Sequence, residues 1–150
     1  MGESRQRTWI AVVDDDPTWL ATLGRALSRE GYHTLLVGDG DRAATRIPHE
    51  EPAAVILDHR MPRTTGVELA RGLRAAMGER CPPLILVTGD LRELAPGDRE
   101  LFVAAYEKPV RLRRLMQELR RVIRGRKSSG TLRRADDDAA PGDDEESAAG

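Results

Sequence analysis

The sequence predicts an α/β fold in which a parallel sheet of five strands carries helices on both faces. Two observations support this prediction. Short apolar runs alternate five times with segments whose apolar residues recur at helical spacing, as in successive strand–helix units. Several runs contain no polar residue, which is typical of strands buried on both sides of a parallel sheet. The 150 residues are enough for one such domain with a sizeable core.

The first strand–helix unit is defined by its capping residues. The apolar run 9–13 is followed by Asp16, which is a good N-cap residue, and by Pro17, which is preorganised for the first helical position. Apolar residues then recur at helical spacing until Gly31, which ends the helix.

The remaining units follow the same alternation. Pro48 is expected to stop the second helix, and Pro96 and Gly97 make the fourth helix a poor one. The last helix has a clear apolar stripe on one side. In chain order, the expected elements are strand 32–37, helix 39–47, strand 54–57, helix 66–77, strand 84–87, helix 91–101, strand 102–106 and helix 111–124.

Composition divides the chain into a short N-terminal lead over residues 1–8, a folded domain over 9–125 and an acidic tail over 126–150. The tail has too little hydrophobic surface to offset the entropy of ordering, so we expect it to be disordered. No apolar run is long enough to span a bilayer, and no signal peptide is recognisable. The single cysteine, Cys81, cannot form an internal disulfide. We therefore expect a cytoplasmic protein without membrane contact.

Polar residues stand at the ends of four predicted strands. Asp14 and Asp15 follow the first strand, Asp58 follows the third, Thr88 follows the fourth and Lys108 comes shortly after the fifth. Because the carboxyl ends of parallel strands form the crevice where ligands bind, we expect these residues to lie together. Taken alone, Asp58 is equally compatible with ordinary turn chemistry, in which an aspartate caps the following loop.

The residue types at these strand ends indicate metal-assisted phosphoryl transfer. Neighbouring carboxylates repel each other unless a cation lies among them, and oxygen ligands without a Cys or His cluster favour Mg2+. The hydroxyl of Thr88 and the ammonium of Lys108 suit phosphoryl oxygens better than they suit a metal. A carboxylate in this setting can act as a nucleophile and form an aspartyl phosphate.

Four motifs, in this order, resemble the receiver domains of two-component response regulators. They are VVDDDP at 12–17, VILDHRMP at 55–62 with Gly66 beyond it, LVTG at 86–89 and EKP at 107–109. The resemblance covers about residues 8–124 and is to single-domain receivers like the chemotaxis regulator. It implies a flavodoxin-like, doubly wound fold with strand order 2-1-3-4-5 and a site beside the switch point of the sheet.

The resemblance also implies a role for each matching residue. Asp58 is the phosphoacceptor. Mg2+ is bound directly by Asp58 and Asp15, through water by Asp14, and by the backbone carbonyl of Arg60. Thr88 hydrogen-bonds the phosphoryl group, Lys108 pairs with it, and the peptide between Lys108 and Pro109 is cis.

The sequence departs from the family at the expected switch region. Receivers usually place an aromatic residue three positions before the conserved lysine, where Ala105 stands here. Tyr106 follows it, and strand alternation points Tyr106 to the other side of the sheet. We expect phosphorylation to be read through a remodelled fourth helix instead of an aromatic switch.

Arg60 and Asp90 lie two residues after Asp58 and Thr88, at positions that flank the path of attacking water in this family. Their opposite charges suggest a lid that lengthens the lifetime of the acyl phosphate. The alternative is two solvated side chains, because exposed ion pairs are typically worth under ~1 kcal/mol.

We interpret the chain as a single-domain receiver that a sensor histidine kinase or a histidine phosphotransferase phosphorylates on Asp58 with Mg2+ as cofactor. It is expected to be a switch and not an enzyme, although it assists its own phosphorylation and dephosphorylation. Output then depends on contacts with an unknown downstream protein. The basic last helix has no interleaved aromatic residues, so we expect no direct nucleic-acid contact. A monomer or weak homodimer is expected.

Two alternatives stay open. The first is a degenerate receiver that acts as a phosphorylation-independent interaction module. Ala105 favours it, whereas the acidic pair, Thr88 and Lys108 argue against it. The second is a Mg2+-dependent phosphohydrolase, which needs an additional acid two residues beyond the nucleophile. Arg60 occupies that position, so this alternative ranks last.

Overall fold

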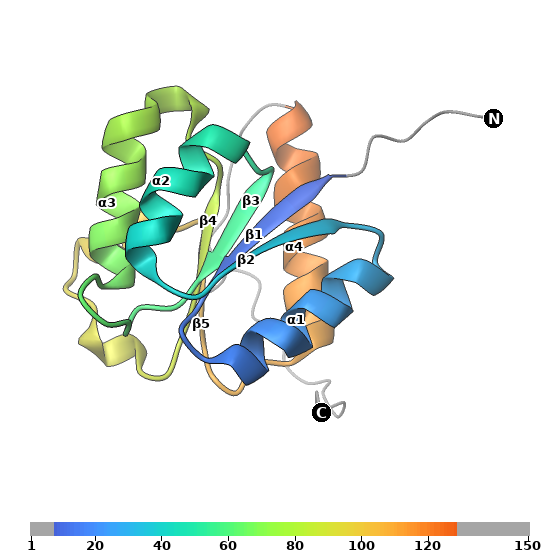
Figure 1. The fold of residues 1–150 in the computed structure, drawn as a ribbon, viewed down its shortest axis with the longest axis horizontal. Helices are drawn as coiled ribbons and strands as arrows, with labels where there is room; N and C mark the ends of the chain where they lie inside the picture. Colours follow the sequence, from blue (N-terminus) through green and yellow to red (C-terminus); the bar gives the residue numbers. More distant parts are fainter. Residues whose placement is uncertain (1–7, 129–150) are drawn as a thin grey trace.

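The computed structural model describes residues 8–128, which form a parallel sheet with helices on both faces (Figure 1). Within these residues, the five strands follow the predicted flavodoxin-like order β2-β1-β3-β4-β5. Each adjacent pair of strands is parallel. The strands are β1 (Trp9–Val13), β2 (His33–Val37), β3 (Ala54–Leu57), β4 (Leu84–Thr88) and β5 (Ala104–Glu107).

Four α-helices cover the sheet in this part of the chain. Helices α2 (Gly40–Glu50) and α3 (Gly66–Met77) lie on one face, and α1 (Pro17–Arg29) and α4 (Leu112–Ser128) lie on the other (Figure 1). Helix α1 starts as predicted, because the Asp16 side chain accepts hydrogen bonds from the first-turn backbone and Pro17 takes the first position.

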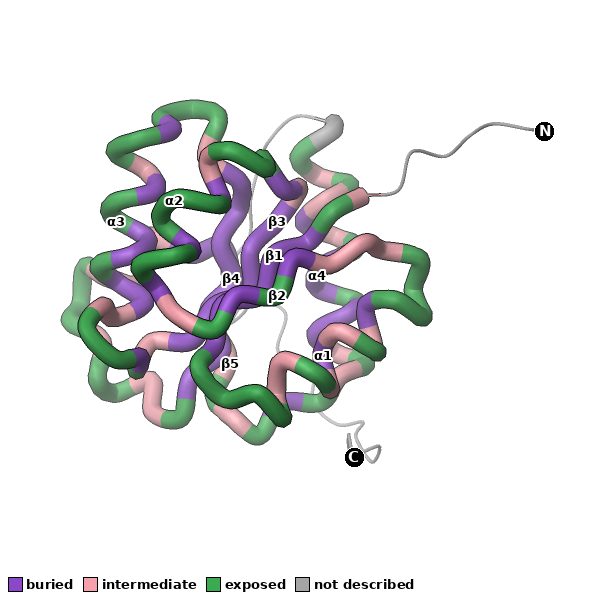
Figure 2. Tube along the Cα trace, viewed as in Figure 1, coloured by how far each residue is buried: buried purple, intermediate pink, exposed green. Residues whose placement is uncertain are grey.

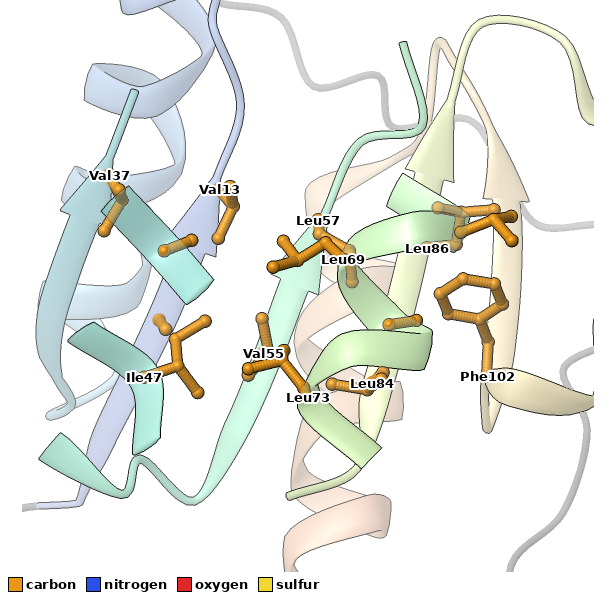
Figure 3. Packing of buried hydrophobic residues seen from close by; sticks show 14 of the residues in the cluster. Val13, Val37, Ile47, Val55, Leu57, Leu69, Leu73, Leu84, Leu86 and Phe102 are labelled. Atoms are coloured by element: carbon orange, nitrogen blue, oxygen red, sulfur yellow. The ribbon is translucent and has the colours of Figure 1, made fainter. Parts of the chain in front are cut away.

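The strands contribute alternate residues to two hydrophobic cores, and Figure 2 shows burial concentrated on the strands and the inner sides of the helices. In the core under α2 and α3, Val55 and Leu57 of β3 lie against Leu69 and Leu73 of α3 (Figure 3). The intervening residue Ile56 belongs to the core under α1 and α4. Burial on both faces explains why the strand sequences are uninterrupted apolar runs.

The expected end of the second helix at Pro48 is wrong. Helix α2 continues through Pro48 to Glu50. Glu51 is its C-cap and adopts a left-handed conformation with φ 49°. Pro48 lacks the N–H that would bond the carbonyl four residues earlier, on Ala44. Ala44 lies on the exposed side of the helix, where water can satisfy that carbonyl.

The segment between β4 and β5 forms two short 3₁₀ helices in place of the poor α-helix expected over 91–101. They are η2 (Leu91–Glu93) and η3 (Asp98–Leu101), and Pro96 and Gly97 lie between them. A further 3₁₀ turn, η1 (Gly78–Arg80), extends α3. The Pro-Gly pair therefore divides the segment as its backbone preferences predict.

Helix α4 extends to Ser128, a few residues beyond the expected boundary at residue 125. Most of the predicted tail and the lead over residues 1–7 lie outside the described residues. Among helices within 8–128, none is long and apolar enough to cross a membrane.

Candidate functional site

The site lies at the carboxyl edge of the sheet, where the backbone ladder continues past the strand ends. The N–H of Asp14 donates to Val37 O at 3.1 Å, and the N–H of Asp58 donates to Val13 O at 3.1 Å. The N–H of Lys108 donates to Thr88 O at 2.8 Å. These bonds fix Asp14, Asp58 and Lys108 beside one another, as the sequence predicted.

Three carboxylates form the acidic centre of the site. Asp14, Asp15 and Asp58 each offer an oxygen, and these oxygens lie within 4.8 Å of one another. Asp14 and Asp58 are buried, whereas Asp15 is exposed. This donor set, with oxygen ligands only and one open side, fits a hard divalent cation such as Mg2+.

The environment of Asp58 opposes its ionisation. Burial is the main cause that raises the pKa of Asp58, and the negative charge of Asp14 raises it further. The ammonium of Lys108 and the backbone N–H of His59, which donates to Asp58 Oδ1 at 2.7 Å, act in the opposite direction. A cation among the carboxylates would relieve the same repulsion, which supports the fit to Mg2+.

Lys108 faces the acidic centre from the end of β5. Its Nζ donates to Asp14 Oδ2 at 2.9 Å and lies 3.8 Å from Asp58 Oδ2. The same ammonium lies 5.4 Å from the ring centroid of Trp19, on the first turn of α1. Thr88, the buried last residue of β4, stands on the strand between β3 and β5. The site therefore combines carboxylates, a hydroxyl and an ammonium on adjacent strand ends.

The loop after Asp58 is closed tightly by Gly66. The Gly66 N–H donates to His59 O at 2.7 Å. A Cβ at this position would lie 2.3 Å from Asp58 O and 2.8 Å from His59 Cα, so only glycine fits. Helix α3 then starts with a capping box between Thr65 and Glu68. Asp58 is thus anchored by the strand before it and by the tight loop after it.

Comparison with known proteins decides the family. Residues 10–120 match the family model described as the response regulator receiver domain. The chain belongs to this family.

Its relatives include larger regulators. Response regulator MprA of Mycolicibacterium vanbaalenii is 36% identical over 116 residues, which are 77% of this chain and 50% of that protein. DNA-binding response regulator MtrA of Mycolicibacterium smegmatis is 39% identical over 88 residues, which are 59% of this chain and 36% of that protein. The chain therefore spans about half the length of the first curated relatives, or less.

Solved receiver structures share the fold. A CheY-like receiver domain from Methylobacillus flagellatus superposes with a TM-score of 0.72 at 26% identity, over 78% of this chain and 99% of that one. TrrA of Thermotoga maritima, in complex with Mg2+-BeF, gives a TM-score of 0.70 at 24% identity, over 77% and 98% of the two chains. The flavodoxin-like receiver fold is confirmed.

The structure gives Arg60 and Asp90 different partners from the expected lid. Arg60 forms an ion pair with Glu93 of η2. Asp90 caps η2 by accepting from Arg92 N at 2.9 Å and pairs with the Arg92 side chain at 3.0 Å. Within the tight η2 turn, the Asp90 carboxylate is paired with Arg92, and Glu93 is brought close to Arg60. The ion pair of Arg60 is therefore with Glu93 and not with Asp90.

Ala105 and Tyr106 point to opposite faces of the sheet, as strand alternation predicted. Ala105 belongs to the core under α2 and α3, and Tyr106 packs against the core under α1 and α4. The Tyr106 hydroxyl donates to Glu118 Oε1 at 3.2 Å, and burial followed by the charge of Glu118 raises the pKa of Tyr106. The predicted cis peptide between Lys108 and Pro109 is present.

Two residues near the site were not singled out from the sequence. Glu93 had no signal beyond its charge, because its approach to Arg60 depends on the η2 turn. Trp19 is one of the apolar residues at helical spacing between Pro17 and Gly31, and a tryptophan in such a pattern is usually a core residue. Only the three-dimensional structure shows that its ring also faces Lys108.

Proposed function

We propose that this receiver accepts a phosphoryl group on Asp58 from the phosphohistidine of a sensor histidine kinase or a histidine phosphotransferase. The observation that supports it most directly is the cluster of Asp14, Asp15 and Asp58 with the Lys108 ammonium 3.8 Å from the acceptor carboxylate. Family membership supports the same reaction. The chain would work as a cytoplasmic switch that assists its own phosphorylation and dephosphorylation, and not as an enzyme with a separate substrate.

The proposed reaction follows from the residues at the strand ends. Asp14, Asp15, Asp58 and the backbone carbonyl of Arg60 would hold Mg2+, which supplies positive charge to the carboxylates and the phosphoryl oxygens. A carboxylate oxygen of Asp58 attacks phosphorus as the bond from phosphorus to the histidine nitrogen breaks. The departing histidine keeps that electron pair. Lys108 and Thr88 donate hydrogen bonds to the phosphoryl oxygens during transfer.

We infer that output passes through the segment between β4 and β5. Ion pairs connect this segment to neighbouring parts of the receiver: Arg60 reaches Glu93 of η2, and Arg71 of α3 reaches Asp98 of η3 at 2.6 Å. Arg60 stands two residues after Asp58, so a dianionic phosphoryl group there would attract its guanidinium, and Glu93, still paired with Arg60, would draw η2 along with it. The remodelled segment would then change its position without an aromatic switch.

The surface of α4 favours output through contacts with a protein and not with nucleic acid. The arginines of α4 lie on an amphipathic helix without interleaved aromatic residues, which is typical of a solvated helix face. The name of the MtrA relative includes DNA binding, but the match covers only 36% of that protein. We propose a monomer or weak homodimer that contacts a downstream protein and no nucleic acid.

The competing function is a receiver that binds partners regardless of phosphorylation. Ala105 at the usual switch position is the observation that favours it. The chemistry of the site, where burial raises the pKa of Asp58 and Lys108 pairs with Asp14, instead supports a functional centre.

Intact-mass measurement after incubation with a small phosphodonor separates the two functions. The native chain with Mg2+ should gain one phosphoryl group. The isosteric variant Asp58→Asn and the native chain without Mg2+ should gain none. If the native chain shows neither an adduct nor donor consumption, the phosphorylation proposal is wrong and the interaction module remains.

A further inference from the structure

The ring of Trp19 is placed at the rim of the acidic site by the first turn of α1. This helix starts directly after Asp14 and Asp15, and Asp16 caps it by accepting from the Trp19 backbone N–H at 3.4 Å. The Trp19 side chain is half-buried, with one part against the core under α1 and α4. Its ring lies 5.4 Å from Lys108 Nζ, within the range of a cation–π contact.

Lys108 has two carboxylate neighbours, Asp14 and Asp58, whose interactions with its ammonium change during the proposed reaction. Its Nζ is hydrogen-bonded to Asp14 and lies farther from Asp58, and 28% of its side chain is exposed. A cation bound among the carboxylates would weaken the attraction of Asp14 for the ammonium. A flexible lysine that loses this partner would spread over many rotamers.

An aromatic ring holds an ammonium without offering it a competing charge. The ring quadrupole attracts the cation, yet it leaves the N–H groups on the other side free to donate to phosphoryl oxygens. Trp19 is the aromatic neighbour of Lys108 among the described residues. Its position is fixed by the helix cap and the core, so it does not depend on the state of the acidic cluster.

We propose that Trp19 is a positioning residue for phosphoryl transfer: its ring holds the Lys108 ammonium at the rim of the site, ready to meet the incoming phosphoryl group. This inference rests on the proposed function of Asp58. The inference also goes beyond the proposed function, because Trp19 lies outside the four motifs that match the family and is given a role in the reaction.

A merely structural role for Trp19 makes a different prediction. If the ring only covers the core, its loss should slow phosphorylation equally whether or not Lys108 is present. If the ring acts through Lys108, the effect should vanish when Lys108 is removed. A double-mutant cycle between the two positions distinguishes these cases.

The kinetic experiment follows Asp58 phosphorylation by a small phosphodonor with saturating Mg2+. Trp19→Leu should slow the reaction by about three- to tenfold, the range that a partly exposed cation–π contact supports. Trp19→Phe, which keeps an aromatic face, should lie between Trp19→Leu and the native chain. In a Lys108→Ala background, Trp19→Leu should have no further effect. Trp9→Leu is the matched control, because that ring stacks on His33 at the opposite end of β1 and should leave the rate unchanged.

Tryptophan fluorescence provides a readout that does not depend on turnover. The chain has two tryptophans, so Trp9→Phe leaves Trp19 as the only tryptophan. Beryllium fluoride with Mg2+, the phosphoryl mimic bound in the TrrA structure, should change Trp19 emission as the ammonium moves. The change should be much smaller after Lys108→Met. An equal change in both backgrounds would contradict contact between ring and ammonium.

The outcomes separate this inference from the proposed function. An adduct on Asp58 with additive losses from Trp19→Leu and Lys108→Ala would overturn the role of Trp19 and leave phosphorylation intact. No adduct on the native chain would overturn both. Urea unfolding of Trp19→Leu checks that the variant is folded under the assay conditions. Trp19→Phe keeps the inference testable if the leucine variant is not folded.

Discussion

The Lys108 ammonium lies 2.9 Å from Asp14 Oδ2 but 3.8 Å from Asp58 Oδ2. The lysine that would stabilise a phosphoryl group is therefore held mainly by a prospective metal ligand and not by the acceptor. Binding of a cation and release of the lysine are then linked events, because both act on the same buried carboxylate.

Mg2+ should stabilise the native chain by binding to its folded state. At 100 times the dissociation constant, the gain in free energy of unfolding is about 2.7 kcal/mol. Asp15→Asn should remove most of this gain, because it removes one of the three negatively charged carboxylates that would bind the cation. Thermal unfolding with and without Mg2+ measures the effect. Asp98→Asn is a control outside the cluster and should retain the native response; an equal loss there would contradict the assigned site.

Stability without Mg2+ should depend on the protonation of Asp58. Burial and Asp14 raise the folded-state pKa of Asp58 above its ordinary value of 3.8. The folded protein therefore binds more protons than the unfolded chain between these two pKa values, and the Asp58 contribution to stability falls as pH rises through that interval. Asp58→Asn should raise the free energy of unfolding at pH 7, and the gain should shrink as pH falls towards 3.8. Urea unfolding at several pH values, without metal, tests this; a gain independent of pH would contradict it.

Gly66→Ala should destabilise the receiver by about 1–3 kcal/mol, as expected for an added methyl group in a packed site. Its Cβ would lie 2.3 Å from the Asp58 carbonyl oxygen, which is backbone and cannot move aside easily. Gly72→Ala is the matched control on the same helix. Its Cβ meets nothing within 4 Å, so it should stabilise by about 0.5–1 kcal/mol. Denaturant unfolding compares them, and equal shifts would contradict the close approach.

The sequence predicted the sheet and the acidic site because both depend on short-range patterns. Each polar residue of the site follows an apolar run, and parallel strands bring their carboxyl ends to one edge. The partner of Arg60 could not be predicted in this way. It depends on the η2 turn, in which Asp90 is engaged by Arg92 and Glu93 is left to approach Arg60.

The failure at Pro48 has a similar cause. Proline usually ends a helix, but its effect depends on whether the carbonyl left without a donor is buried or exposed. Here Ala44 is exposed and Ile47 is fully buried, so packing holds the last turn of α2 in place. Which side of the helix is exposed depends on how the helix packs, and the proline rule alone does not take this into account.

The ion pair between Arg60 and Glu93 should slow hydrolysis of phospho-Asp58. It joins the loop after β3, which begins with Asp58, to the turn after β4, which ends at Thr88. Glu93→Gln and Arg60→Ala should each speed dephosphorylation, by up to about fivefold, because exposed ion pairs are worth at most about 1 kcal/mol. Arg80→Ala removes an exposed ion pair with Glu51, which involves neither Arg60 nor Glu93, and serves as the control. Rates unchanged in both variants would exclude a role for the pair in the phosphoryl lifetime.

Tyr106→Phe should affect stability and leave phosphorylation unchanged. The Tyr106 hydroxyl donates to Glu118, whose side chain is only 3% exposed and is also paired with Arg121 at 3.0 Å. A hydrogen bond to a charged, buried acceptor contributes about 1.5–3 kcal/mol, so the free energy of unfolding should fall by that amount. The rate of Asp58 phosphorylation should stay native, because Tyr106 faces α4 and not the acceptor. Urea unfolding and the intact-mass time course give the two readouts. A native stability with slowed phosphorylation would instead place Tyr106 in the switching pathway, in the role that an aromatic at position 105 usually has in receivers.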